Sequence, residues 1–130
     1  MVKYMSPEWA VEYCKVLNAS EAYEKAGETW EGDFIFQADY EDGTVVRLHM
    51  DLHHGKCRGT KVVGPDDTAA FVMSGPYANW KAVAEKELDP IRGLLSGKFK
   101  LDGDMAVVMR HTKAAVEMVN CIMLVPDTEL

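Results

Sequence analysis

The sequence has few basic residues, and it lacks any long hydrophobic run. Its 14 lysines and arginines are outnumbered by 21 aspartates and glutamates, which gives a net charge of −7. A general nucleic-acid-binding protein needs a basic face for phosphates, so this balance argues against that class and against adhesion to anionic membranes. The apolar run over residues 121–125, which no other run exceeds in length, is far shorter than a membrane-spanning helix requires. We therefore expect no nucleic-acid partner and no stable membrane insertion, and we favour a small molecule as the partner.

Cysteine is also scarce. Cys14, Cys57 and Cys121 lie far apart and show no Cys-x-x-Cys spacing. An odd number of cysteines, in a chain that does not begin with an apolar secretion segment, is typical of reduced thiols in a cytosol. We therefore predict a cytoplasmic protein whose cysteines are free.

The signatures of common enzyme classes are missing. No Gly-x-Ser-x-Gly elbow is present and no cysteine lies beside a basic cluster, so nucleophilic catalysis by Ser74 or a cysteine, with His111 as base, is not favoured. Gly93, Gly97 and Gly103 do not form the glycine patterns of phosphate-binding loops. We predict a protein that is not an enzyme and needs no cofactor.

One group of metal-ligand residue types does occur. His49, Asp51 and His53 alternate along a predicted strand, with His54 and Cys57 nearby. Alternate side chains of a strand share a face but are spaced by about 7 Å, too far apart for one ion unless they converge. We therefore interpret the group as the solvated face of a half-buried strand. A metal-dependent enzyme built on His49, His53 and Cys57 is the weakest of three functional hypotheses.

Periodicity and capping signals predict alternating helices and strands. Strand 46–53 alternates most clearly, with its apolar residues on one face, which is typical of an antiparallel sheet with one covered side. Strand 68–74 is apolar on both faces, so we place it inside the sheet. In chain order, the predicted elements are a helix opened by Ser6-Pro7, a helix over 20–26, strands 33–40, 46–53, 56–63 and 68–74, helices opened by Gly75-Pro76 and Asp89-Pro90, a strand over 98–101, and one helix from Met105 to near Asn120.

The apolar residues either fill a core or enclose a pocket. Periodicity alone favours a filled core. Six of the eight methionines lie beyond residue 49, however, and unbranched thioether side chains line adaptable cavities well. The candidate pocket residues are Phe34, Phe36, Leu48, Met50, Phe71, Met73, Trp80, Ile91, Leu94, Leu95, Phe99, Met105, Met109, Met118 and Met123.

The stretch from Trp80 to Asp104 carries a family resemblance. A tryptophan-bearing helix follows a strand, Asp89-Pro90 opens the next helix, and residues 94–104 then read LLSGKFKLDGD. This order resembles the C-terminal half of the sterol carrier protein type-two family, the non-specific lipid-transfer proteins and their prokaryotic relatives. The resemblance covers nearly the whole chain and is strongest over residues 71–118.

The resemblance implies a single domain over residues 1–130 with an α+β fold. Its five-stranded, mainly antiparallel sheet would be covered on one side by helices, with an apolar tunnel between them. Trp80, Phe99, Leu101 and Met105 lie on motif positions and would belong to the core or to the tunnel wall. A lysine such as Lys98 or Lys100 would hold a headgroup at the mouth.

The resemblance also implies a function. The protein would hold a fatty acyl chain, acyl-CoA or sterol-like ligand and carry it without bond chemistry. Glu129 breaks the peroxisomal address of animal members, which favours a prokaryotic stand-alone protein and an acyl ligand over a sterol. The alternative is a homodimeric structural or interaction module without a transferable ligand.

Overall fold

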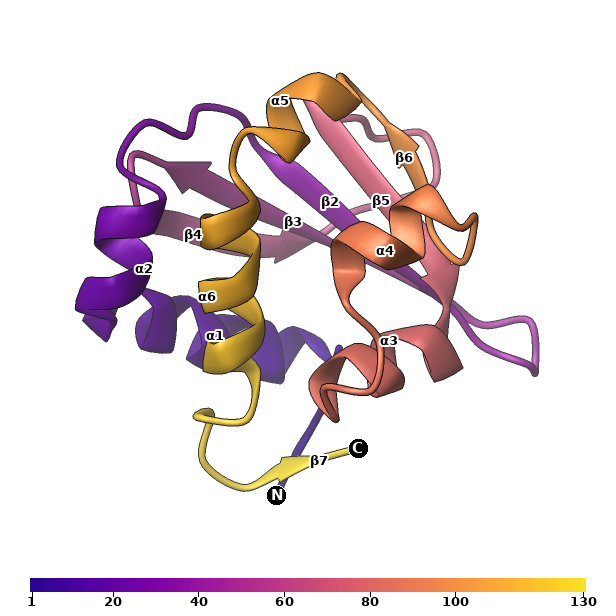
Figure 1. Cartoon of the computed structure of the whole chain (residues 1–130). Helices are drawn as coiled ribbons and strands as arrows, with labels where there is room; N and C mark the ends of the chain where they lie inside the picture. The colour runs from indigo at the N-terminus through magenta and orange to yellow at the C-terminus, as the bar shows by residue number, and fades with distance from the viewer.

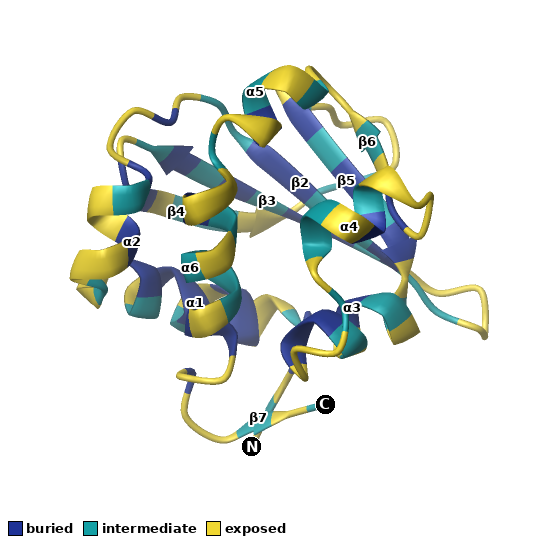
Figure 2. Ribbon diagram, viewed as in Figure 1, coloured by how far each residue is buried: buried dark blue, intermediate teal, exposed yellow.

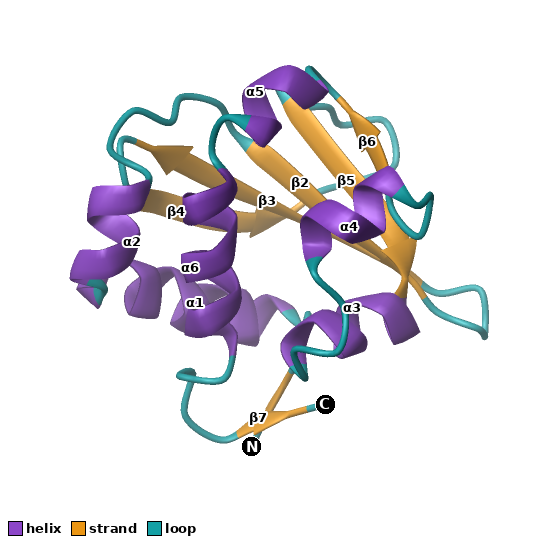
Figure 3. Cartoon of the chain, in the orientation of Figure 1, coloured by secondary structure: helices purple, strands orange, loops and turns teal.

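The protein is a five-stranded sheet with a layer of helices on one side, as its computed structural model shows for all 130 residues (Figures 1 and 3). The strand order is β4-β3-β2-β5-β6. β2 and β5 are parallel neighbours, and the other neighbouring pairs are antiparallel. The predicted α+β fold, with its mainly antiparallel sheet and single covered side, is confirmed.

The elements follow the predicted order, except that the last helix is divided in two and a short strand is added at each end of the chain. The two-residue strands β1 and β7 pair in parallel and hold the termini together (Figure 1). They were not predicted, because two residues carry no periodicity. None of the helices is long and apolar enough to cross a membrane. The bounds are β1 Val2–Lys3, α1 Pro7–Ala19, α2 Glu21–Ala26, β2 Phe34–Asp39, β3 Val45–His53, β4 Lys56–Val62, β5 Phe71–Pro76, α3 Tyr77–Ala84, α4 Pro90–Leu95, β6 Lys100–Asp102, α5 Met105–Met109, α6 Thr112–Ile122 and β7 Thr128–Glu129.

Side-chain caps begin several helices at the predicted positions. Ser6, Ser20, Asp89 and Asp104 each accept a hydrogen bond from a backbone N–H in the first turn of the helix that follows. These bonds satisfy donors that have no partner within the helix. Local chemistry therefore sets where these helices start.

The last predicted helix is broken in two. Arg110 and His111 separate α5 from α6, whereas the sequence predicts one helix over residues 105–120. His111 leaves the helical conformation, with φ −121° and ψ 35°, and its Nδ1 lies 2.8 Å from the carbonyl oxygen of Val107. A side chain that bonds the carbonyl four residues back competes with the backbone for that acceptor. The break therefore has a local cause that hydrophobic periodicity does not report.

The face of the sheet that points away from the cavity is less exposed to solvent than the alternation of β3 predicts. Arg47 is only 9% exposed. Its guanidinium donates to the Gln37 side chain and to the main-chain oxygens of Gly64 and Asp67. β4 is an edge strand and β5 lies beyond β2, so their connection has to pass the sheet, and its contacts with Arg47 show that it does so over this face. Arg47 fixes that connection in place.

Asp33, just before β2, supports the same face through both of its carboxylate oxygens. Oδ1 accepts from the N–H of Ala70 at 2.8 Å, and Oδ2 lies 2.7 Å from His49 Nε2. Burial raises the pKa of Asp33, but the hydrogen bonds from Ala70 and His49 outweigh it, so the pKa is lower than usual. A lowered pKa stabilises the folded state above the unfolded pKa, and this stabilisation is lost as the pH falls through the folded value.

We therefore expect Asp33→Asn to lower the free energy of unfolding at neutral pH. The difference from the wild type should shrink as the pH is lowered through the pKa of Asp33. Urea unfolding at neutral and at strongly acidic pH measures both quantities. A difference that stays constant over this range would show that the ionised carboxylate does not stabilise the fold.

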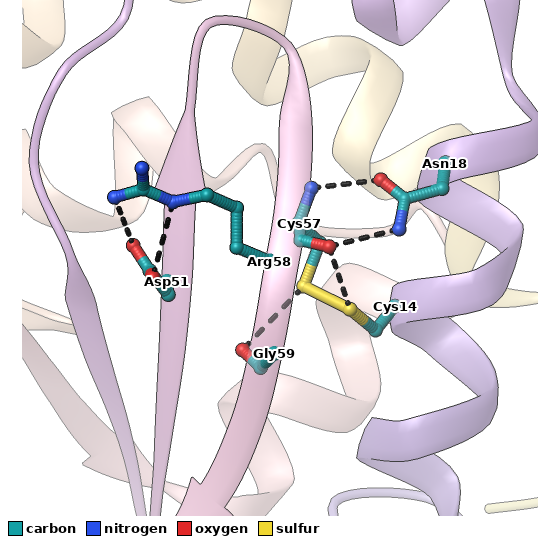
Figure 4. Close-up of a disulfide and its surroundings, with 6 residues drawn as sticks. All are labelled: Cys14, Asn18, Asp51, Cys57, Arg58 and Gly59. Carbon is teal, nitrogen blue, oxygen red and sulfur yellow. Dashed lines mark hydrogen bonds and ion pairs between the residues drawn. A yellow bond between two sulfur atoms is a disulfide. The ribbon is translucent and has the colours of Figure 1, made fainter.

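A disulfide joins Cys14 of α1 to Cys57 of β4, with the Cα atoms 5.5 Å apart (Figure 4). The prediction that all cysteines are free is therefore wrong, and Cys121 is the free cysteine. The pairing was missed because it depends on α1 packing against an edge strand 43 residues away. Asn18 strengthens the junction, since its side chain both donates to Cys57 O and accepts from Cys57 N–H at 2.8 Å.

Removing the disulfide should destabilise the protein by about 4 kcal/mol, because the cross-link restricts a long loop of the unfolded chain. Denaturant unfolding of the wild type with and without a thiol reductant measures this loss. The double variant Cys14→Ser/Cys57→Ser is the control, and its stability should not respond to the reductant. Equal stability of the oxidised and reduced wild type would contradict the expectation.

Candidate functional site

An apolar cavity lies between the sheet and the helices. It has a volume of about 110 Å³, measured as the space open to the centre of a water molecule. Of its 24 lining residues, 22 are hydrophobic, and the others are Pro90 and His111. One water needs about 10–15 Å³ on this measure, so the void has room for several groups of that size. The apolar residues therefore enclose more space than they fill.

Part of the predicted pocket set lines this cavity. The sheet contributes from β2, β3 and β5, and the helices contribute from α3, α4 and α6. These lining residues are Phe34, Phe36, Leu48, Met50, Met73, Trp80, Ile91, Leu94 and Met118. Their contact with a ligand stays a prediction.

The other predicted residues lie outside the cavity lining. They are Phe71, Leu95, Phe99, Met105, Met109 and Met123. Phe71 is buried and packs against Trp30, with ring centroids 4.9 Å apart. Leu95, Met109 and Met123 are exposed on helix surfaces or just beyond α6.

Phe99 is buried beside the cavity rather than in its wall. A Cβ atom added at Gly75 would lie 2.6 Å from the Phe99 ring, and one added at Gly93 would lie 2.7 Å from it. Only glycine therefore fits at these two positions. The ring also meets Trp80 edge-on at 4.8 Å. Phe99 thus packs between α4 and β5 and contacts Trp80, which lines the cavity.

Phe99→Ala should destabilise the protein by about 3–5 kcal/mol, because it empties a tightly packed site. The fraction of the variant protein that remains folded should keep most of its affinity for any cavity ligand, since Phe99 does not line the cavity. Thermal unfolding and ligand titration at low temperature separate the two effects. Loss of ligand binding with unchanged stability would instead assign Phe99 to the binding wall.

The N-terminal half supplies a wall that the sequence analysis missed. Tyr4, Trp9, Tyr13, Tyr23 and Trp30 all line the cavity. The helical spacing of Trp9 and Tyr13 was a usable signal, because it marks an inward-facing stripe. It does not distinguish a stripe that fills a core from one that borders a void.

The polar atoms of this wall mostly bond to the main chain. Tyr4 Oη donates to Trp80 O at 3.1 Å, and Tyr13 Oη donates to Met118 O at 2.7 Å. Burial raises the pKa of both tyrosines, and it raises the pKa of Tyr23 to about 12. These phenols are therefore uncharged at neutral pH, and the wall carries no negative charge.

His111 is the one histidine of the lining, and both of its ring nitrogens have protein neighbours. Nδ1 lies 2.8 Å from Val107 O, and Nε2 lies 3.2 Å from Thr29 Oγ1. Lys98 and Lys100, the predicted headgroup partners, do not line the cavity. The lining therefore contains no lysine, arginine or carboxylate.

Half-buried lining residues show where the cavity approaches the surface. Ile91 and Leu94 on α4, and Ala115 and Met118 on α6, are all partly exposed. Both helices carry intermediate and exposed stretches (Figure 2). Phe36 is also partly exposed, although it belongs to the central strand β2. These residues place the mouth between α4 and α6.

The metal-ligand residue types of β3 and β4 are divided among separate pairs. His49 pairs with Asp33 and His54 with Glu31. Arg58 binds Asp51 at 3.1 Å, on the side of β4 away from the disulfide (Figure 4). No group of three or more histidine, cysteine, aspartate or glutamate side chains is placed to hold a metal ion.

Comparison with known proteins gives a sequence profile, described as the SCP-2 sterol transfer family, that matches residues 14–115. The chain belongs to this family. Its members bind and transfer lipids and are generally non-enzymatic carriers. The family resemblance seen in the sequence is thereby confirmed.

Solved structures agree with this membership. A crystal structure of sterol carrier protein 2 is 35% identical, with a TM-score of 0.87 over 94% of this chain and 98% of that one. A conserved hypothetical protein from Thermus thermophilus, described as possibly sterol carrier protein, is also 35% identical, with a TM-score of 0.87 over 96% and 91%. Sterol carrier protein 2 from Yarrowia lipolytica, at 17% identity and a TM-score of 0.52 over 94% and 82%, shares the fold alone. No curated protein sequence matches significantly.

Proposed function

We propose that this member of the SCP-2 sterol transfer family binds a long-chain acyl lipid, such as a fatty acid or an acyl thioester, and carries it without making or breaking bonds. The main support is the cavity, because 22 of its 24 lining residues are hydrophobic. Each CH₂ group removed from water contributes about 0.8 kcal/mol, so chain burial alone supplies affinity. A longer ligand would extend through the mouth between α4 and α6.

The chemistry of the lining supports carriage rather than catalysis. It contains no serine, cysteine, lysine or carboxylate, and the ring nitrogens of His111 already face Val107 and Thr29. Nucleophilic and acid–base catalysis both need such a group within hydrogen-bond reach of the reacting atom. The proposed ligand contacts are the apolar lining residues alone.

Palmitate is a reasonable first probe. A protein of the same fold from Aedes aegypti, 17% identical with a TM-score of 0.55, is described as palmitated. A cytoplasmic location stays a prediction. The free thiols on which it rested are replaced by the Cys14–Cys57 disulfide, which counts against it because disulfides are rare in cytosolic proteins.

A side chain that fills the mouth should block binding. Ala115 on α6 lines the cavity, and its neighbour Val116 is 49% exposed and lies outside the lining. Ala115→Phe should weaken palmitate binding by about tenfold or more, because displacing two or more CH₂ groups costs that much. Val116→Phe, the matched control, should bind like the wild type.

Displacement of a fluorescent fatty acid from delipidated protein measures these affinities. Native mass spectrometry with light scattering then distinguishes this proposal from the alternative, a homodimeric structural module without a ligand. Palmitate-bound monomer or dimer mass supports a carrier. A dimer that takes up neither palmitate nor the fluorescent probe would overturn the proposal in favour of a structural module.

A further inference from the structure

One residue of the cavity lining has a strained backbone. Four residues other than glycine have a positive φ, and three of them, His54, Lys86 and Asp127, are exposed in turns. The fourth is Met5, which has a φ of 65°, is only 3% exposed and lines the cavity. The Cβ atom makes this conformation unfavourable, so it persists only where the surroundings enforce it, and such residues are common at ligand sites.

Met5 occupies the third position of the turn between β1 and α1. Ser6 N–H donates to Lys3 O at 3.0 Å across this turn. Tyr4 N–H donates to Glu129 O at 2.8 Å, which fixes the chain just before Met5. A turn that needs a positive φ at its third position normally has glycine there. Methionine therefore brings a side chain that the turn itself does not need, at a residue that borders the cavity.

The end of the cavity at which Met5 lies is closed. The lining follows α6 from His111, which is half-buried, to Ile122, which is 6% exposed. After α6 the chain forms β7, which pairs with β1 just before the Met5 turn, so Met5 belongs to the Ile122 end (Figure 1). Tyr4 of the same turn and Val83 of α3 also line the cavity, and they are 1% and 2% exposed. The lining at this end is therefore shut off from solvent.

We propose that Met5 is the end wall of the cavity and sets the length of the acyl chain that the protein accepts. This inference rests on the proposed function and names a specificity-determining residue of the same site. The lining has no lysine or arginine, so the tail of a fatty acid enters first and its carboxylate stays at the mouth. A tail that is long enough then ends against Met5, whereas a shorter tail does not reach it.

The chain-length dependence of affinity reports where the tail meets this wall. Each buried CH₂ group raises the affinity about fourfold. We expect this gain with each added CH₂ until the tail reaches Met5, and a much smaller gain beyond that length. The affinity of the wild type therefore reaches a plateau within a series of saturated fatty acids.

The test is the series laurate, myristate, palmitate, stearate and arachidate, whose neighbouring members differ by two CH₂ groups. Displacement of a fluorescent fatty acid from delipidated protein gives each affinity. Met5→Ala removes the outer part of the side chain and leaves room for about two more CH₂ groups. The plateau should move to the next longer fatty acid, and the affinity at the new plateau should be about tenfold higher than that of the wild type.

Met118→Ala is the matched control. Met118 lines the cavity at the mouth, so chains of every length pass it. This variant should change the affinity for all five fatty acids by a similar factor and leave the plateau at the wild-type length.

Met5→Gly tests the role of the strained backbone. It removes the same side chain and also relieves the strain, because glycine adopts a positive φ freely. Met5→Gly should therefore unfold at a higher urea concentration than Met5→Ala, the reverse of the usual order of these two residues. Both variants should show the same longer plateau.

The outcomes distinguish this inference from the proposed function. If the wild type binds the series but both Met5 variants keep its plateau, Met5 is not the end wall and the carrier proposal stands. An equal shift of the plateau in Met118→Ala would also overturn the assignment of Met5. If the wild type binds none of the five fatty acids, both proposals fail.

Discussion

The helical layer is attached to the sheet and to itself at fixed points, and these attachments maintain the space inside. Cys14 and Cys57 join α1 to β4, and Tyr13 bonds α1 to the carbonyl of Met118 on α6. Trp80 bonds α3 to the carbonyl of Gln37 on β2. Moving the layer inward to fill the void would break hydrogen bonds whose polar atoms are already buried. That loss opposes the hydrophobic gain of closing the cavity.

The same attachments give the cavity its chemical character. Most of the tyrosine hydroxyl and tryptophan N–H groups of the lining donate to main-chain oxygens. The large rings therefore face the void as nearly apolar surfaces. Affinity for the proposed acyl ligand then comes from the length of chain that is buried. A lipid carrier needs such a site, since one with many specific contacts would release its ligand slowly.

Local signals in the sequence predicted most of the fold but only part of the cavity. Caps such as Ser6 and Asp89, and the alternation of β3, depend on residues close together in the chain. The sequence therefore predicted the helix starts and this strand correctly. The helix break at His111, the Cys14–Cys57 disulfide and the β1–β7 pair depend on side-chain competition or on distant partners. For the cavity, the inward stripe of α1 was visible, but periodicity reports only which face is buried. Whether the buried face meets another side chain or an empty space is decided by how far apart the layers are held.

The most direct test of the account is the content of the cavity in the cell. The protein would be purified from its natural host without detergent, analysed by native mass spectrometry, and extracted to identify any bound lipid. The account predicts a fraction of the protein with the added mass of one acyl lipid, which extraction removes and methyl palmitate or palmitate replaces. Protein that carries no lipid from the host, and takes up neither compound afterwards, would contradict it.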